Sequence, residues 1–256
     1  RRGIRPGQDY PGDLKTPMEH LALGIDIGGS GIKAAIVNTS NAGLVSPRLR
    51  AATPEGARPA DVARKLNTLV SSLDWHGPAG IAFPAVIQNG MVRTAANIDP
   101  AWIGEDVLRI CSTESTCSFT AVLNDADAAG LALVRHVPEA RSCPGTVLVL
   151  TVGTGLGTAL FTGGRLVPNL ELGHIELDGI EAEAWASDAA RKKEDLSWEK
   201  WGKRLSSVLA RLEALLWPDL IILGGGAAKK FDRFAAQLHT RALLIPSPLL
   251  NNAGII

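Results

Sequence analysis

The segment Leu21–Val37, LALGIDIGGSGIKAAIV, joins two short apolar runs through a glycine-rich turn. The same pattern returns at residues 146–161, TVLVLTVGTGLGTALF. Apolar runs of this length that end at glycines are typical of buried strands. Each segment therefore predicts a strand, a glycine turn and a second strand. We interpret the two segments as a duplicated unit in which each copy presents backbone N–H groups from its turn.

Strands and helices alternate through the rest of the chain, which favours an α/β fold. Helical periodicity with a terminating Pro218 predicts one long helix, and Asp219–Leu223 predicts the strand after it. We also expect a final helix with Phe231, Phe234 and Leu238 on one side. The other expected elements are helices at Pro59–Leu73 and from Asp125 to about Arg135, and strands at Ala79–Phe83 and Phe119–Leu123.

Composition indicates a soluble globular protein, in which any site for a polyanion would have to be a local patch. The 26 Lys and Arg residues balance the 26 Asp and Glu residues among 256, so net charge favours neither nucleic acid nor membrane. No apolar run has the length of a membrane span. Three cysteines without a metal or disulfide spacing indicate reduced thiols in the cytoplasm. Residues 1–17, rich in Gly, Pro and Arg, predict a mobile tail.

The first glycine turn has the composition of a phosphate cradle. A carboxylate before such a turn suits Mg²⁺, held directly or through water, because Mg²⁺ takes one or two carboxylates plus phosphate oxygens. An ordinary hairpin with a surface acid is the alternative. The candidate phosphate-binding residues are Asp26, Gly28, Gly29, Ser30, Gly31 and Lys33, with Asp26 as the metal ligand.

The second turn lacks the Gly-Lys-Ser/Thr of a Walker loop, and a strand rather than a helix follows it, unlike a dinucleotide fingerprint. Its pairing with the first turn favours phosphate binding by Thr151, Gly153, Thr154, Gly155 and Gly157. A third glycine motif, Gly224, Gly225 and Gly226, opens a segment after a strand. It suits an anion or a nucleotide edge, or simply close helix–strand packing.

Asn124 and Asp125 follow a strand, where α/β folds tend to bind ligands. Phosphoryl transfer to a hydroxyl needs a carboxylate that accepts its proton, and Asp125 is our candidate. The alternative is a helix N-cap. Glu171 and His174 lie three residues apart, so in a helical segment both side chains would point to one side. There they could pair with the hydroxyl groups of a sugar. Glu183 adds another acceptor.

Taken together, these motifs resemble the ROK family of bacterial sugar kinases from Leu21 onward. DIGGSGIK, TVGTGLG, LGGG, LNDADAAG, LELGH and the Glu183–Ser187 segment match the family's motifs, and GIAFPAV departs from one of them at Ala85. The resemblance implies a two-lobed actin-like fold of the ribonuclease H type with a central cleft, and Asp125 as catalytic base. It implies a hexose bound by Asn97, Asn124, Asp125, Glu171, His174 and Glu183.

The lobes expected on this basis are a smaller one over 18–123, completed by about 245–256, and a larger one over 124–244. A homodimer is common in the family and is expected here. Most members carry a zinc-binding cysteine cluster after the Gly-His segment, but residues 175–187 contain no cysteine. The resemblance therefore implies no structural zinc. This departure is similar to the polyphosphate/ATP-dependent glucokinase branch, which implies glucose and mannose as acceptors and ATP or polyphosphate as donor.

Six basic residues within fourteen positions agree with a polyphosphate donor, since a polyanion favours a basic groove. Interspersed acids also allow a solvated helix face instead. The residues are Arg191, Lys192, Lys193, Lys200, Lys203 and Arg204.

Three other functions stay open. A sugar-responsive repressor of the same family would carry an N-terminal helix-turn-helix, for which residues 1–20 give little room. A kinase of fructose or an N-acetylated hexosamine depends on loop geometry that the sequence does not specify. A non-enzymatic actin-like filament or chaperone module would not need the Glu-x-Gly-His segment.

Overall fold

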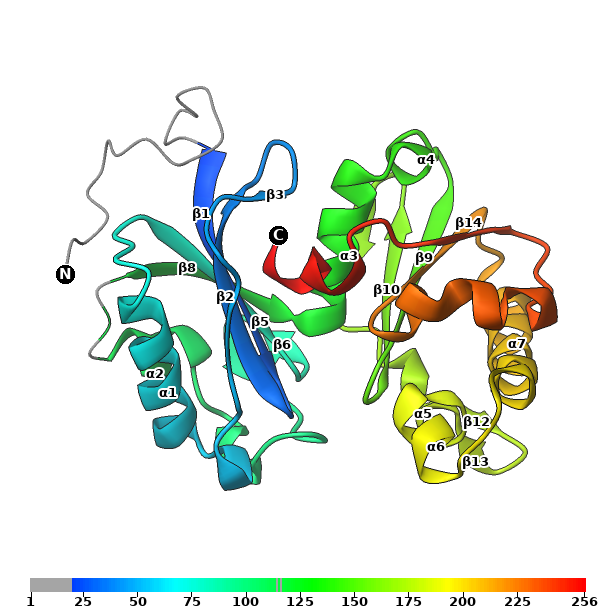
Figure 1. The fold of residues 1–256 in the computed structure, drawn as a ribbon, viewed down its shortest axis with the longest axis horizontal. Helices are drawn as coiled ribbons and strands as arrows, with labels where there is room; N and C mark the ends of the chain where they lie inside the picture. Colours follow the sequence, from blue (N-terminus) through cyan, green and yellow to red (C-terminus); the bar gives the residue numbers. More distant parts are fainter. Residues whose placement is uncertain (1–19, 114, 116) are drawn as a thin grey trace. The chain divides into compact units, whose positions relative to one another are not determined.

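The computed structural model describes residues 20–113, 115 and 117–256, so the predicted tail lies outside the described residues (Figure 1). The chain divides into two compact units. Unit 1 runs to Ala129 and takes back Gly254–Ile256, and unit 2 comprises Gly130–Ala253. The division falls inside one helix, α3 (Asp125–His136). Each unit contains its own mixed sheet.

The sheet of unit 1 is built on the first predicted hairpin. Its order is β3-β2-β1-β5-β8, and β4 also pairs with β2. β1 and β2 are antiparallel, whereas β5 and β8 run parallel to β1. The strands are β1 (Leu21–Gly28), β2 (Gly31–Asn38), β3 (Gly43–Leu44), β4 (Leu49–Ala51), β5 (Pro78–Phe83) and β8 (Ser118–Asn124).

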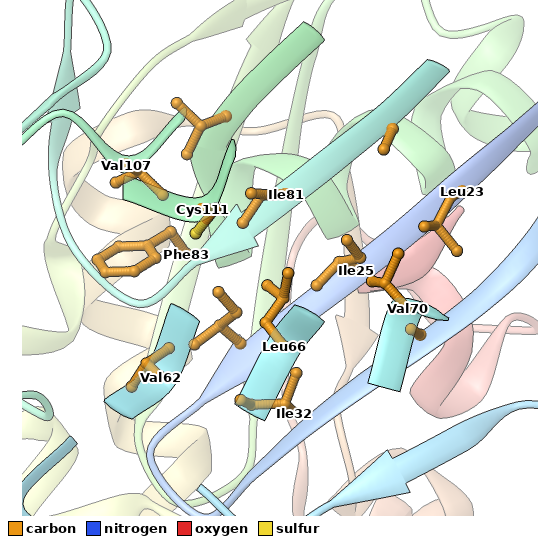
Figure 2. Packing of buried hydrophobic residues seen from close by; sticks show 14 of the residues in the cluster. Leu23, Ile25, Ile32, Val62, Leu66, Val70, Ile81, Phe83, Val107 and Cys111 are labelled. Carbon is orange, nitrogen blue, oxygen red and sulfur yellow. The ribbon is translucent and has the colours of Figure 1, made fainter. Parts of the chain in front are cut away.

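Two helices cover one face of this sheet, α1 (Pro59–Ser71) and α2 (Val107–Ser112) (Figure 2). Pro59 suits the start of α1 because a backbone N–H at this position would have no acceptor within the helix, so the helix loses no hydrogen bond there. Ile25 and Leu66 meet in the core, each at most 1% exposed. Smaller elements complete the unit: η2 (Glu55–Ala57), β6 (Ile87–Gln88), β7 (Met91–Val92) and η3 (Pro100–Trp102).

The sheet of unit 2 repeats this arrangement. Its order is β11-β10-β9-β14-β15, with β9 and β10 antiparallel and β14 and β15 parallel to β9. In both sheets a hairpin pair is followed by two parallel strands, so the predicted duplicated unit and the α/β class are confirmed. The strands are β9 (Thr146–Val152), β10 (Leu156–Thr162), β11 (Arg165–Val167), β14 (Leu220–Gly224) and β15 (Leu243–Pro246).

The long helix α7 (Trp198–Leu216) buries an apolar stripe against the sheet of unit 2. Ser197 caps it by accepting from the Lys200 N–H, and Trp217 ends it in the left-handed region at φ 48°. The remaining elements of this region are α4 (Pro138–Arg141), η4 (Leu172–His174), β12 (Glu176–Leu177), β13 (Ile180–Glu181), α5 (Ala182–Ala186) and α6 (Asp188–Lys193).

The prediction of a final helix is wrong. The chain forms two short 3₁₀ segments instead, η5 (Ala227–Arg233) and η6 (Ala235–Gln237), before the terminal η7 (Leu250–Ile255). Lys230 leaves helical geometry at φ −119°. Phe234 is fully buried, with its ring centroid 4.8 Å from that of Trp201, so tertiary packing overrides the helical spacing.

Over the residues that the structure describes, no helix has both the length and the apolar character needed to cross a membrane.

Candidate active site

In unit 1 the candidate residues gather where three parallel strands end. Asp26 lies opposite Ala82, and Phe83 lies opposite Asn124, so the ends of β1, β5 and β8 are aligned. Asp125 follows directly. Because α/β sheets bind ligands outside the carboxyl ends of their parallel strands, this edge is the expected place for a site.

The first glycine turn is a two-residue connection, with Gly28 paired to Gly31 across it. None of its glycines has a positive φ. Close approach explains Gly29 instead, because a methyl group there would lie 3.2 Å from the Asn97 carbonyl oxygen. The loop that carries Asn97 therefore lies against this turn. Asp26 Oδ2 lies 2.6 Å from the Lys33 ammonium, so these two predicted residues form an ion pair.

Asn124, not Asp125, caps α3. The Asn124 Oδ1 atom accepts hydrogen bonds from the N–H groups of Ala126 (2.9 Å) and Asp127 (3.2 Å). Its Nδ2 donates to the Ala85 carbonyl at 3.2 Å, and the side chain is buried. Asp125 stands partly exposed in the first helical turn, where its Oδ1 also accepts from the Ala126 N–H. Asn124 thus fixes the backbone from which the Asp125 carboxylate projects.

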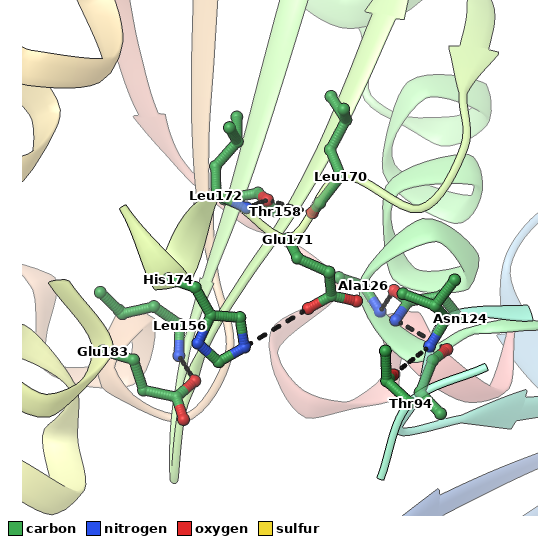
Figure 3. A network of polar contacts seen from close by, with 12 residues as sticks. Thr94, Asn124, Ala126, Leu156, Thr158, Leu170, Glu171, Leu172, His174 and Glu183 are labelled. Atoms are coloured by element: carbon green, nitrogen blue, oxygen red, sulfur yellow. Dashed lines mark hydrogen bonds and ion pairs between the residues drawn. The ribbon is translucent and has the colours of Figure 1, made fainter. Parts of the chain in front are cut away.

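In unit 2 the second glycine turn is joined to the predicted sugar residues. Glu183 Oε2 accepts a 2.9 Å hydrogen bond from the Leu156 N–H (Figure 3). A methyl group on Gly155 would collide with the Glu183 carboxylate, and one on Gly173 would collide with the Leu156 carbonyl. The turn, the Glu-x-Gly-His segment and α5 are therefore packed together, and two glycines permit that packing.

His174 lies between two carboxylates. Its Nε2 is 3.9 Å from Glu171 Oε2, and its Nδ1 is 3.4 Å from Glu181 Oε2. Burial raises the pKa of Glu171; the nearby His174 lowers it, and the charge of Glu183 raises it further. The segment forms a 3₁₀ turn with Glu171 at its N-cap position, which places both side chains on one side of the turn. The structure therefore brings Glu171, His174 and Glu183 together.

The third glycine motif is explained by packing. Gly225 has φ 78°, and a methyl group on it would lie 2.5 Å from the Val152 carbonyl oxygen. A left-handed φ and a backbone this close both require glycine. Gly224 pairs with Thr151 across β14 and β9, so the second and third glycine motifs share one edge of the sheet. The segment after Gly226 is a 3₁₀ helix, which offers a less regular row of N–H groups than the predicted helix.

Acidic neighbours neutralise most of the predicted basic segment. Burial raises the pKa of Asp188, but hydrogen bonds from Lys192 and Arg191 outweigh it and leave that pKa below its usual value. Lys203 pairs with Glu199 at 2.8 Å, and Arg204 pairs with Glu194 at 2.6 Å. Among the described residues, Lys193 and Lys200 have no carboxylate within ion-pairing distance. These contacts favour the solvated face, and a polyphosphate role for the segment stays a prediction.

No three His, Cys, Asp or Glu side chains gather around a possible metal position in the part of the chain that the structure describes. One partly buried carboxylate, Asp26, lies at the first turn, with a side chain 15% exposed. This donor set fits Mg²⁺, which takes its other ligands from water and phosphate oxygens. It does not fit an ion that needs a cage of protein ligands.

Two residues at these sites went unnoticed in the sequence. Glu181 lies in the second strand of the short hairpin after the Glu-x-Gly-His segment. The register of that hairpin brings the Glu181 side chain back beside His174. Arg50, on β4, lies opposite Lys33, on β2. Short strands without strong alternation carried no signal for either contact.

Comparison with known proteins identifies the family. A model of the ROK family matches residues 22–190. The polyphosphate glucokinase of Mycobacterium tuberculosis is 42% identical over 241 residues, which make up 94% of this chain and 90% of that protein. That of Mycobacterium leprae is 41% identical over 252 residues, 98% of this chain and 78% of that protein.

Solved structures give the same result. The polyphosphate/ATP-glucomannokinase of Arthrobacter sp. strain KM has a TM-score of 0.88 and 40% identity, covering 92% of this chain and 95% of that chain. The ROK glucokinase of Streptomyces griseus, solved with glucose and AMPPNP, has a TM-score of 0.76 at 21% identity, a likeness of fold that covers 92% and 96%. The two-lobed actin-like α/β fold is confirmed. This chain belongs to the ROK family.

Proposed function

We propose that this protein transfers the terminal phosphoryl group of inorganic polyphosphate or ATP to the 6-hydroxyl of glucose. The support is a relative 42% identical over most of both chains that is named polyphosphate glucokinase. The solved structure at 40% identity is a polyphosphate/ATP-glucomannokinase, which makes mannose a second acceptor. Among the predicted functions this one accounts together for the glycine turns, the Asp125 carboxylate beside the helix cap and the Glu-x-Gly-His segment.

The observation that carries the proposal is that Asn124, and not Asp125, caps α3. Since the Asn124 amide caps α3, the Asp125 carboxylate is not needed for that role. A carboxylate held on a rigid helix end can orient a hydroxyl and accept its proton. As the sugar oxygen forms a bond to phosphorus, the bond to the donor's bridging oxygen breaks, and the hydroxyl proton passes to Asp125.

The sugar-binding residues comprise two sets, Asn97, Asn124 and Asp125 in unit 1 and Glu171, His174 and Glu183 in unit 2. Carboxylates accept hydrogen bonds from hydroxyl groups, and the imidazole can donate or accept. Sites that match each hydroxyl with a partner reject analogues that lack one. Each set is proposed to contribute to the recognition of the hexose.

The phosphate-binding residues are those of the first turn, the second turn and Gly224–Gly226. Backbone N–H groups in tight turns attract phosphate oxygens without a side chain between them. Asp26 would hold Mg²⁺, which supplies charge stabilisation for the transferring group when it is bound. Lys33, paired with Asp26, adds a cation at the same turn.

A homodimer in the cytoplasm completes the proposal. Cys111 and Cys143 are free thiols in the structure. Free thiols suit a reducing compartment.

An assay of glucose 6-phosphate formation with Mg²⁺ and either long-chain polyphosphate or ATP tests the proposal. Turnover with either donor is expected, and the Asp125→Asn variant should lose about three orders of magnitude in kcat while it still binds glucose. Binding is followed by calorimetry. Normal turnover of the variant contradicts the role of Asp125. Turnover with fructose or an N-acetylhexosamine but not with glucose or mannose contradicts the acceptor.

A further inference from the structure

Three charged side chains form one row across the first sheet of unit 1. Asp26 on β1 lies opposite Lys33 on β2, and Lys33 lies opposite Arg50 on β4. In antiparallel pairs, residues directly opposite each other project from the same face. Ile25 and Ile32 project from the other face into the core. Arg50 therefore shares its face with the two charged residues of the first glycine turn.

The Arg50 side chain also lies against that turn. A methyl group placed on Gly31 would be 3.1 Å from Arg50 Nε and 3.5 Å from its Nη2. The guanidinium is therefore in contact distance of the turn backbone, and the missing side chain of Gly31 gives it that position. Arg50 itself is exposed to solvent.

The charges in the row do not cancel. Lys33 and Asp26 neutralise each other at 2.6 Å. Of the residues that the structure describes, no carboxylate lies within ion-pairing distance of Arg50. One uncompensated positive charge therefore stands beside a turn whose N–H groups already favour anions.

We propose that Arg50 binds the phosphoryl donor at the first glycine turn. This inference rests on the proposed function and adds to it a residue outside the family motifs. A planar guanidinium presents several N–H donors and can hold two phosphate oxygens at once, whereas an ammonium acts as a point charge. Arg50 is therefore a phosphate-binding residue that serves polyphosphate and ATP alike.

The test compares Arg50→Gln, Arg50→Lys and a matched control, Arg64→Gln. Arg64 lies in the same unit on α1, 71% exposed and paired with Asp61 at 3.0 Å. We expect R50Q to raise the KM for polyphosphate by about 10- to 100-fold, R50K to raise it less, and R64Q to leave it unchanged. The KM for glucose should stay within about twofold in all three variants. A donor KM within about twofold of wild type in a folded R50Q protein overturns the inference.

Calorimetric binding of tripolyphosphate gives a second readout that needs no turnover. R50Q should bind it about 10- to 100-fold more weakly than wild type, with a smaller dependence on salt. If wild type fails to phosphorylate glucose but R50Q still weakens tripolyphosphate binding, the glucokinase function falls and the Arg50 site stands. If turnover is normal but R50Q binds tripolyphosphate as wild type does, the Arg50 site falls and the function stands. Melting temperatures of the variants separate both results from misfolding.

Discussion

The carboxylate of Glu183 accepts a 2.9 Å hydrogen bond from the backbone N–H of Leu156. Leu156 begins β10, directly after the tip of the second glycine turn. A predicted sugar residue on α5 therefore holds the backbone of a predicted phosphate turn. Within unit 2, the proposed acceptor and donor residues are thus joined by one hydrogen bond, so a change in either should affect the other.

Gly155→Ala tests this coupling. The added methyl group would collide with the Glu183 carboxylate, so Glu183 must move and release Leu156. We expect turnover to fall at least about tenfold, but the free energy of unfolding to fall by only about 1 kcal/mol, because the flexible end of the Glu183 side chain can move aside and one hydrogen bond is lost. Kinetics and urea denaturation measure the two effects.

Gly80→Ala is the matched control, because beyond its two chain neighbours no described residue has an atom within 4 Å of the added methyl group, and φ is not positive. Removing the carboxylate as well, in a Gly155→Ala, Glu183→Ala double variant, should cost less than the two single changes added together. Strict additivity in this double-mutant cycle would show that the two residues act independently.

The capping of α3 predicts different consequences for two adjacent residues. Asn124→Ala removes the acceptor for the Ala126 and Asp127 N–H groups and should lower the free energy of unfolding by about 1–2 kcal/mol. Asp125→Ala should lower it by less but abolish turnover. Chemical denaturation and single-turnover kinetics of both variants make the comparison. A larger loss of stability in the Asp125 variant would mean that Asp125 is the effective cap.

The hairpins were predictable from sequence because each is a local pattern. An apolar run, a glycine turn and a second run fix β1 with β2 and β9 with β10 before any tertiary contact is known. Part of the basic segment was readable in the same way. Asp188 and Lys192 lie one helical turn apart, and so do Glu199 and Lys203, so their pairing follows from spacing.

Other features depend on contacts that span the chain. Arg204 on α7 reaches Glu194 at the end of α6, ten residues earlier, which no periodicity encodes. The final helix failed because burial of Phe234 beside Trp201 fixes the chain more strongly than its spacing does. In sequence Asp125 was open as catalytic base or helix cap, and only the hydrogen bonds of the Asn124 amide assign the cap to its neighbour.

The raised pKa of Glu171 predicts how stability and binding depend on pH. Because burial favours the neutral form, the folded state binds this proton more tightly than the unfolded chain does. The charged form therefore opposes folding at pH values above the raised pKa, and this cost disappears below the ordinary carboxyl pKa, where both states are protonated. Glu171→Gln should accordingly raise the melting temperature at pH 7 and lose that advantage in acid.

Glucose binding should change in the opposite sense. In the proposed site the Glu171 carboxylate would accept hydrogen bonds from the sugar, so the glucose KM of wild type should rise as pH falls through the raised pKa. In Glu171→Gln the KM should be higher throughout and flatter with pH. Melting curves and glucose kinetics from pH 4 to 8 measure both effects. A variant less stable than wild type at pH 7 would contradict the cost assigned to the buried charge.

The contact between His174 and Glu181 predicts a positioning role for a residue outside the sugar set. The Glu181 carboxylate lies 3.4 Å from Nδ1, nearer than the Glu171 carboxylate at 3.9 Å from Nε2, so it favours the proton on Nδ1 and leaves Nε2 to accept from a sugar hydroxyl. Glu181→Ala should shift the His174 ring toward the other tautomer, seen in its ¹⁵N chemical shifts, and raise the glucose KM by about 3- to 10-fold, with a smaller change in kcat.

Glu176 is the matched control, since it faces Glu181 across the same hairpin and carries the same charge. Glu176→Ala should leave both the ring and the KM as they are. An unchanged tautomer in Glu181→Ala would contradict the positioning role.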